Sequence, residues 1–145
     1  MQNQDSGGFV MILGVDFGDS RTGYAVSDAL GFSAHTLETF HEKNMVKVAN
    51  HTAEIVKNLG AEKIVLGFPK NMNGTVGERG KKTKAFEKLL KTLVDCPIIL
   101  WDERLTTVSA HNLMNETNVR GKKRKDSVDR IAAAFILQGY LDSQK

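Results

Sequence analysis

The acidic residues that follow apolar stretches are the side chains of this sequence best suited to chemistry. Asp16 lies at the end of the apolar stretch 10–17, and Asp102 and Glu103 follow the apolar stretch 97–101. An ionised carboxylate at the end of a buried strand is costly unless a cation pairs with it, so Asp16 needs a partner. Consecutive strand residues point to opposite faces, so only one of Asp102 and Glu103 can share a site with Asp16. We prefer Glu103 for its longer side chain, although alternation alone does not decide between them.

A further carboxylate lies in the stretch 126–141, which has the apolar character of a helix packed deep against a sheet. Asp129 shares a helical stripe with Ala132 and Ala133, and such small neighbours let a helix approach a strand end closely. Asp126 lies one turn earlier on the same face and is a candidate fourth ligand. As structural alternatives, Asp126 could be a helix N-cap, and Asp129 could be a first-turn acid favoured by the helix dipole.

The strand-end acids also have structural alternatives. Asp16 could form a simple salt bridge with Arg21 or Arg130, and residues 102–103 could form a surface pair with Arg104. Each alternative is reasonable for one residue alone. The carboxylates all lie at compatible ends of predicted elements, and this coincidence favours a shared site.

Three or four carboxylates without Cys or His among them form an all-oxygen donor set, which suits Mg²⁺ or Mn²⁺ better than zinc. Two such ions about 4 Å apart activate a water and stabilise the leaving oxygen in phosphodiester cleavage. A basic run at 120–125 and the lysines within 81–91 would then hold a polyanionic substrate, or they could be a solvated loop and a solvated helix face. The candidate contacts in the basic run are Lys122, Lys123, Arg124 and Lys125.

The order of predicted elements indicates how these side chains would be positioned. Strands at 10–17, 22–28 and 32–40 are joined by short turns, so they should be antiparallel neighbours. An amphipathic helix follows, with Asn44 as N-cap and Gly60 after its end. The later elements are a strand at 63–67, a helix around 85–93, a strand at 97–101, a helix from 106 or 107 to about 115, and a helix at 126–141. Strand–helix–strand crossovers give parallel strands, which predicts an α/β fold with a mixed five-stranded sheet and ligands outside the carboxyl ends of its parallel strands.

Length and composition are typical of one globular domain. The 145 residues, with 41% hydrophobic and 26% charged, suit a single domain at 10–145 after a polar extension at 1–9. No apolar run approaches the ~18 residues of a membrane span. The single Cys96 excludes an internal disulfide, and 1–9 does not have the pattern of a signal peptide. A cytoplasmic location is therefore expected.

Four motifs, taken together and in order, resemble the YqgF family. These bacterial proteins are described as Holliday-junction resolvases or pre-ribosomal-RNA nucleases with a ribonuclease H-like fold. The resemblance covers residues 10–141. The motifs are GVDFG with RTG at 14–18 and 21–23, GFP with NGT at 67–69 and 73–75, DERLTT at 102–107, and Asp129 with Ala132 and Ala133.

The resemblance implies that Asp16, Glu103 and Asp129 are catalytic carboxylates that bind Mg²⁺ or Mn²⁺. The substrate contacts that it implies, from the loop after the fourth strand and from nearby arginines, are Arg21, Lys70, Asn73 and Arg104. The implied substrate is structured nucleic acid. The leading expectation is 5′-end maturation of the 16S rRNA precursor in ribosome biogenesis by a monomer or weak homodimer, and the alternative is resolution of DNA four-way junctions.

Two functions of other classes remain as alternatives. A catalytically silent nucleic-acid-binding module would bind in a salt-sensitive manner without hydrolysis under any divalent ion. A nucleotide phosphatase of the sugar-kinase and actin type would use 16–18 and 21–23 as a phosphate loop. Those proteins close two such domains over ATP, and 145 residues supply only one.

Overall fold

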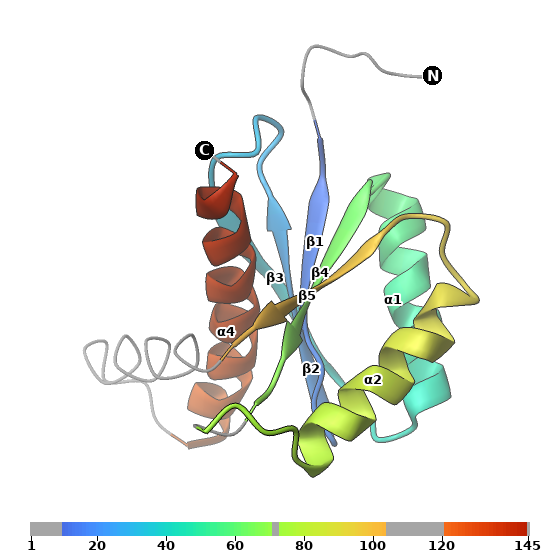
Figure 1. Cartoon of the computed structure of the whole chain (residues 1–145). Coiled ribbons are helices and arrows are strands. Elements are labelled where there is room, and N and C mark those ends of the chain that lie inside the picture. The colour runs from blue at the N-terminus through green and yellow to red at the C-terminus, as the bar shows by residue number, and fades with distance from the viewer. Residues whose placement is uncertain (1–9, 71–72, 104–120, 145) are drawn as a thin grey trace.

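A five-stranded mixed sheet forms the centre of the molecule (Figure 1). The computed structural model describes residues 10–70, 73–103 and 121–144, with side chains from 128 onward in the last range. The strands lie in the order β3-β2-β1-β4-β5, with β1–β2 and β2–β3 antiparallel and β1–β4 and β4–β5 parallel. This confirms the predicted sheet. The strands are β1 (Ile12–Asp16), β2 (Arg21–Ser27), β3 (Ala34–His41), β4 (Lys63–Phe68) and β5 (Ile98–Asp102).

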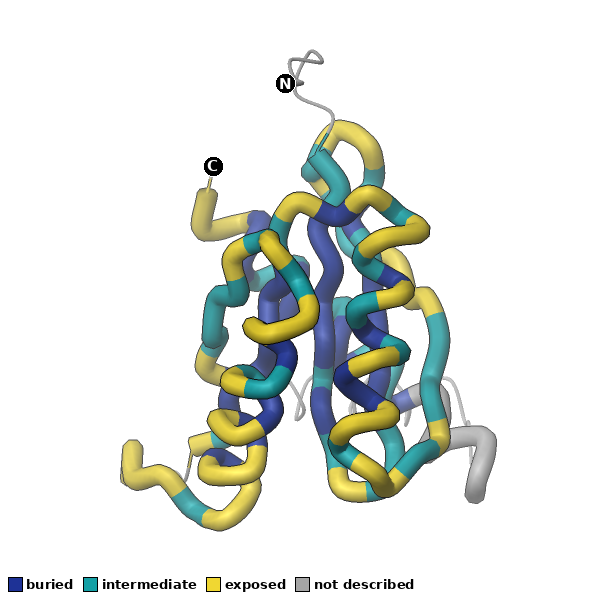
Figure 2. The backbone as a smooth tube through the Cα atoms, turned by 90° about the vertical axis from the view of Figure 1, so that its right-hand side faces the viewer, coloured by how far each residue is buried: buried dark blue, intermediate teal, exposed yellow. Residues whose placement is uncertain are grey.

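Helices cover both faces of the sheet. α1 (Met45–Leu59) and α2 (Glu78–Lys91) lie on one face, and α4 (Gly121–Ser143) lies on the other (Figure 1). Strand alternation divides the core accordingly, because Leu13 and Val15 pack with α1 and α2 while Ile12 packs with α4. Figure 2 shows buried residues along the inner sides of the helices and exposed residues along their outer sides.

The caps of α1 confirm the sequence prediction. The Asn44 side chain accepts a hydrogen bond from the backbone N–H of Lys47, and Gly60 follows the helix with a φ of 65°. A left-handed residue at this position is inexpensive only for glycine, which explains why the helix ends there.

The helices α2 and α4 begin earlier than their apolar residues indicate. α2 starts at Glu78, and α4 starts at Gly121 instead of Asp126. The predicted basic loop is therefore wrong over 121–125, because Lys and Arg are good helix formers and extend α4 by more than a turn. With the helix starting at Gly121, Asp126 is not its N-cap and Asp129 is not in its first turn. The predicted helix at 106–115 and the extension at 1–9 lie outside the described residues, so the domain division stays a prediction.

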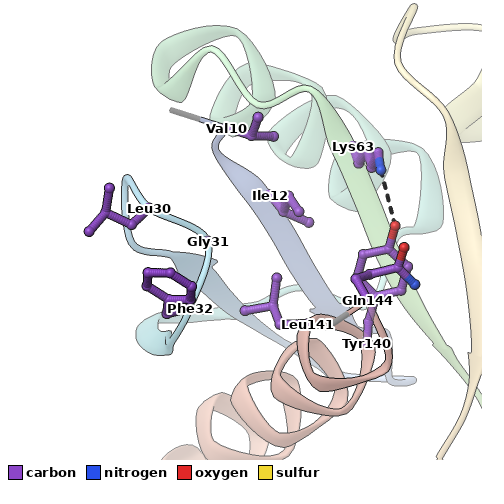
Figure 3. A pocket seen from close by; sticks show the side chains of 9 residues that line it. All are labelled: Val10, Ile12, Leu30, Gly31, Phe32, Lys63, Tyr140, Leu141 and Gln144. Carbon is purple, nitrogen blue, oxygen red and sulfur yellow. Dashed lines mark hydrogen bonds between the residues drawn. The ribbon is translucent and has the colours of Figure 1, made fainter. Parts of the chain in front are cut away.

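The two ends of the sheet differ in character. The carboxyl ends of β1, β4 and β5 and the amino ends of α2 and α4 lie in the lower half of Figure 1. The opposite end carries an apolar groove of about 430 Å³ between the amino ends of β1 and β4 and the last turns of α4 (Figure 3). In that groove Lys63 Nζ donates a hydrogen bond to the Tyr140 hydroxyl at 3.1 Å. Within the described ranges, no helix combines the length and the apolar character that a membrane span requires.

Candidate active site

Two buried carboxylates meet at the carboxyl ends of the parallel strands, and we call them the acidic pair. Asp16 is the last residue of β1, and Glu103 directly follows β5. Their side chains are only 13% and 5% exposed, respectively, and the charge of Glu103 raises the pKa of Asp16. The backbone N–H of Glu103 donates to the carbonyl of Phe68 at 3.3 Å, which continues the β4–β5 pairing and fixes the position of Glu103.

Strand alternation explains why Glu103 and not Asp102 joins Asp16. Ile99 and Trp101 pack into the core under α4, so Glu103, two residues after Trp101, points to that same face. Asp16 follows Ile12 by an even number of residues and also points there. Asp102 is exposed. The structure therefore places Glu103 beside Asp16 because of its phase along β5, and the length of its side chain is not the reason.

Gly67 makes room for the Glu103 carboxylate. A Cβ atom added to Gly67, which lies in β4, would overlap Glu103 Oε2 and Ile136 Cδ1. A glycine inside a strand often marks such a close approach, but sequence reasoning placed Gly67 only at the end of the predicted strand 63–67 and in the following substrate loop. The glycine is therefore part of the site, although it contributes no side chain.

Among the described residues, Arg79 is the cation that pairs with both acids, and sequence reasoning missed it. Its Nη2 atom lies 3.5 Å from Glu103 Oε1 and 3.9 Å from Asp16 Oδ1. It reaches the pair from the first turn of α2, which packs closely because Gly80 has no side chain: a Cβ there would lie 3.0 Å from the Pro69 carbonyl oxygen. In the sequence, Arg79 is one of many cations between 79 and 91, and no spacing distinguishes it.

Asp129 is held at the same end of the molecule by Arg21. The Arg21 Nε atom donates to Asp129 Oδ2 at 2.7 Å, so Arg21 pairs with Asp129 and not with Asp16 as one alternative supposed. A Cβ at Gly23 would overlap the Asp129 carbonyl, which shows that the backbone of α4 contacts β2 directly. Ala132 is buried, as expected for a helix that approaches the sheet this closely.

Burial dominates the electrostatics of the acidic pair. Desolvation raises the pKa of Asp16 well above its ordinary value, and the charges of Glu103 and Asp129 raise it further, whereas Arg79 lowers it. Desolvation likewise raises the pKa of Glu103, which Arg79 partly offsets. Among the described residues, the charge of Arg79 therefore does not offset the burial of the pair.

The donor set fits a hard divalent cation. Among the described residues, the buried side-chain oxygens without a hydrogen-bond partner are Asp16 Oδ1, Glu103 Oε2 and Thr22 Oγ1. Two of these three belong to the acidic pair, and carboxylate oxygens are the ligands that Mg²⁺ and Mn²⁺ prefer. Within the part of the chain that is described, no three acidic, histidine or cysteine side chains are grouped closely enough to hold a metal as they stand.

The remaining predicted contacts are partly described. Lys70 and Asn73 are exposed in the segment after β4. Asn73 Oδ1 accepts hydrogen bonds from the backbone N–H and the hydroxyl of Thr75, at 3.1 and 2.7 Å, so it stabilises its own turn. Arg104 lies outside the described residues, as do the side chains of Lys122, Lys123, Arg124, Lys125 and Asp126.

Comparison with known proteins agrees with this geometry. A family model described as RuvX, Holliday junction resolvase, matches residues 10–143. A protein of Clostridium novyi (strain NT) that bears the name pre-16S rRNA nuclease is 52% identical over 132 residues, which is 91% of this chain and 98% of the relative. A Bacillus subtilis (strain 168) protein of the same name is 46% identical over 134 residues, covering 91% of this chain and 97% of the relative.

Solved structures share the fold at low sequence identity. Thermus thermophilus RuvC in complex with a Holliday junction substrate superposes with a TM-score of 0.60 at 12% identity, covering 93% of this chain and 95% of that one. The fowlpox virus resolvase in complex with Holliday junction DNA gives 0.55 at 12% identity, covering 93% and 99%. The fold is therefore that of ribonuclease H-like nucleases. With the family match spanning nearly the whole chain, this protein belongs to the RuvX, or YqgF, family and is a hydrolase of phosphodiester bonds.

Proposed function

We propose that this chain is a divalent-metal-dependent nuclease that processes the 5′ end of the 16S rRNA precursor in the cytoplasm. The observation that carries the proposal is the acidic pair, which has two buried oxygens without hydrogen-bond partners and lies at the carboxyl ends of parallel strands. The substrate class is supported by relatives near 50% identity that bear the name pre-16S rRNA nuclease.

The catalytic residues in this proposal are Asp16, Glu103 and Asp129. The acidic pair would hold Mg²⁺ or Mn²⁺, which when bound supplies an activated water and stabilises the leaving oxygen. Asp129 would join as a third ligand once its carboxylate leaves Arg21, and the released Arg21 guanidinium would bind a phosphate of the substrate. Asp126 stays a candidate further ligand, one helical turn before Asp129.

Basic residues around this end of the molecule would bind the nucleic-acid backbone. Phosphate contacts position a substrate without reading its sequence, so they suit a nuclease that recognises structure. The exposed lysines of α2 extend the positive surface away from the acidic pair. The proposed contacts are Arg21, Lys70, Asn73, Arg104, Lys122, Lys123, Arg124 and Lys125.

The test is a cleavage assay with the purified full chain. A 16S precursor fragment and a DNA four-way junction are each incubated with Mn²⁺ or with EDTA, using the wild type, Asp16→Asn and Asp129→Asn. Asp102→Asn is the matched control, because it neutralises an exposed acid next to Glu103. We expect metal-dependent cleavage of the precursor by the wild type and the control, and loss of cleavage in both other variants. Undiminished cleavage by Asp16→Asn would contradict the catalytic assignment.

Resolution of DNA four-way junctions is the second candidate function. It is favoured by the description of the family model and by the likeness to two resolvases whose structures contain junctions. Junction resolution requires two symmetrical cuts, so it favours a two-fold dimer, whereas a monomer or weak homodimer suffices for the RNA. Cleavage of the junction alone in the same assay would select this function. Binding of both substrates without cleavage would instead indicate a silent binding module.

A further inference from the structure

The Arg79 guanidinium lies beside the acidic pair. Its guanidinium is the cation within 4.0 Å of both Asp16 and Glu103 among the described ion pairs. The two distances, 3.9 and 3.5 Å, are those of charge contacts, and Asp16 Oδ1 keeps no hydrogen-bond partner. The guanidinium therefore compensates charge at the pair without completing its hydrogen bonding.

Most of the Arg79 side chain is exposed to solvent. It is 57% exposed, in contrast to the nearly buried carboxylates, so the guanidinium can turn into solvent without opening a core cavity. Its backbone, by comparison, is fixed, because the first turn of α2 packs against the Pro69 carbonyl at Gly80. A mobile, permanently charged group on a fixed base can be present at the site in one state and absent in another.

We propose that Arg79 is the resident counter-cation of the acidic pair in the metal-free protein and that a divalent cation displaces it. The inference rests on the proposed function in that the acidic pair is taken as the metal site. Arg79 holds two like charges together while the metal is absent and competes with the metal for them. It is thus a positioning residue whose charge sets the metal affinity.

The competition has a definite sign. A divalent cation that enters beside Arg79 must either be repelled by its charge or replace it, and both reduce the apparent affinity. Removal of the Arg79 charge should therefore tighten metal binding. A residue that only supported the fold of the site would have the opposite effect, because its loss would disorder the ligands.

The experiment measures Mn²⁺ binding to the full chain without nucleic acid, from the loss of the free Mn²⁺ signal in electron paramagnetic resonance. Wild type is compared with Arg79→Gln, Arg79→Lys and Asp16→Asn. Lys82→Gln is the matched control: it removes the same charge from the same helix, but Lys82 pairs with the exposed Asp19 at 3.1 Å. Circular dichroism verifies that each variant is folded.

We expect Arg79→Gln to lower the Kd for Mn²⁺ by about tenfold. Arg79→Lys, which keeps the charge on a compact ammonium, should stay within about threefold of wild type. Lys82→Gln should be unchanged, and Asp16→Asn should abolish binding. Suppose that wild type binds Mn²⁺ and Asp16→Asn does not. If Arg79→Gln then binds Mn²⁺ as well as wild type or more weakly, this inference is overturned and the proposed metal site stands. Equal binding by wild type and Asp16→Asn overturns the inference together with the proposed metal site.

Discussion

Neutralising Asp16 should make the metal-free protein more stable while it removes catalysis. Burial raises the pKa of both members of the acidic pair, and the charge of Glu103 raises the pKa of Asp16 further. An asparagine at position 16 has nearly the shape of a protonated aspartate, and its amide can donate to Glu103 without the cost of a second buried charge. We therefore expect Asp16→Asn to unfold at a higher temperature than wild type in EDTA at about pH 8.

The size of the effect follows from burial. The carboxylates are 13% and 5% exposed, so solvent screens them little. Leaving a buried polar group without its partners costs about 1–3 kcal/mol. At about 3 °C per kcal/mol for a domain of this size, the melting temperature should rise by about 3–9 °C.

The pH dependence provides an internal control. Because the pKa of each acid is higher in the folded protein than in the unfolded chain, the folded protein binds more protons between those two values. Wild type therefore loses stability as the pH rises through that window. Asp16→Asn has one fewer such acid and should lose less stability over the same pH range. The difference in melting temperature should shrink as the pH falls through that window, because Asp16 and Glu103 of wild type then take up protons.

The assay is thermal unfolding followed by circular dichroism, with Asp102→Asn as the control. The exposed Asp102 carries no such burial cost, so its neutralisation should shift the melting temperature by no more than about 2 °C. Added Mn²⁺ should stabilise wild type and leave Asp16→Asn unchanged. A melting temperature of Asp16→Asn below that of wild type at about pH 8 in EDTA would refute the reasoning, because the buried charges would then be fully compensated.

Three further predictions test other parts of the structure. Gly67→Ala should lower the initial rate of cleavage by about tenfold or more, since the new methyl would overlap Glu103. It should also lower the free energy of unfolding in urea by about 1–3 kcal/mol. Unchanged rates would show that Glu103 needs no such space. At subsaturating Mn²⁺ the initial rate should rise with pH above the ordinary carboxylate range, because the raised pKa of the acidic pair must be passed before metal binds; a flat profile would contradict this. Tyr24→Phe should cost about 1 kcal/mol in urea unfolding, because it removes the buried 2.6 Å hydrogen bond to Thr52. Cleavage should be unchanged, because Tyr24 packs on the face of the sheet opposite the acidic pair; a selective loss of cleavage would place Tyr24 in the site.

The elements that the sequence predicts best are those with a strong local signal. The alternating strands, the two caps of α1 and the carboxylate at the end of β1 all follow from short-range patterns. The start of α4 does not, because a run of lysines and arginines forms a helix as readily as it forms a solvated loop. Boundaries of this kind depend on tertiary packing.

The site itself depends on which face of the sheet each helix covers, and the sequence does not contain that information in any local form. The choice between Asp102 and Glu103 required the position of α4. The roles of Gly67 and Arg79 required the close approach of neighbouring elements, which no periodicity reveals. Carboxylates were found because they are rare after apolar runs, whereas one more cation in a lysine-rich segment has no distinguishing feature.

The division of the core by the sheet has a practical consequence for protein engineering. The apolar cluster beneath α1 and α2 lies on the opposite face from the one toward which Asp16 and Glu103 point. Thermostabilising replacements around Val48 and Ile55 should therefore leave the geometry of the acids undisturbed, because the sheet backbone separates the two layers. Replacements for heat resistance around α1 and replacements at the acids can thus be optimised in separate rounds, provided that Arg79 of α2 is kept.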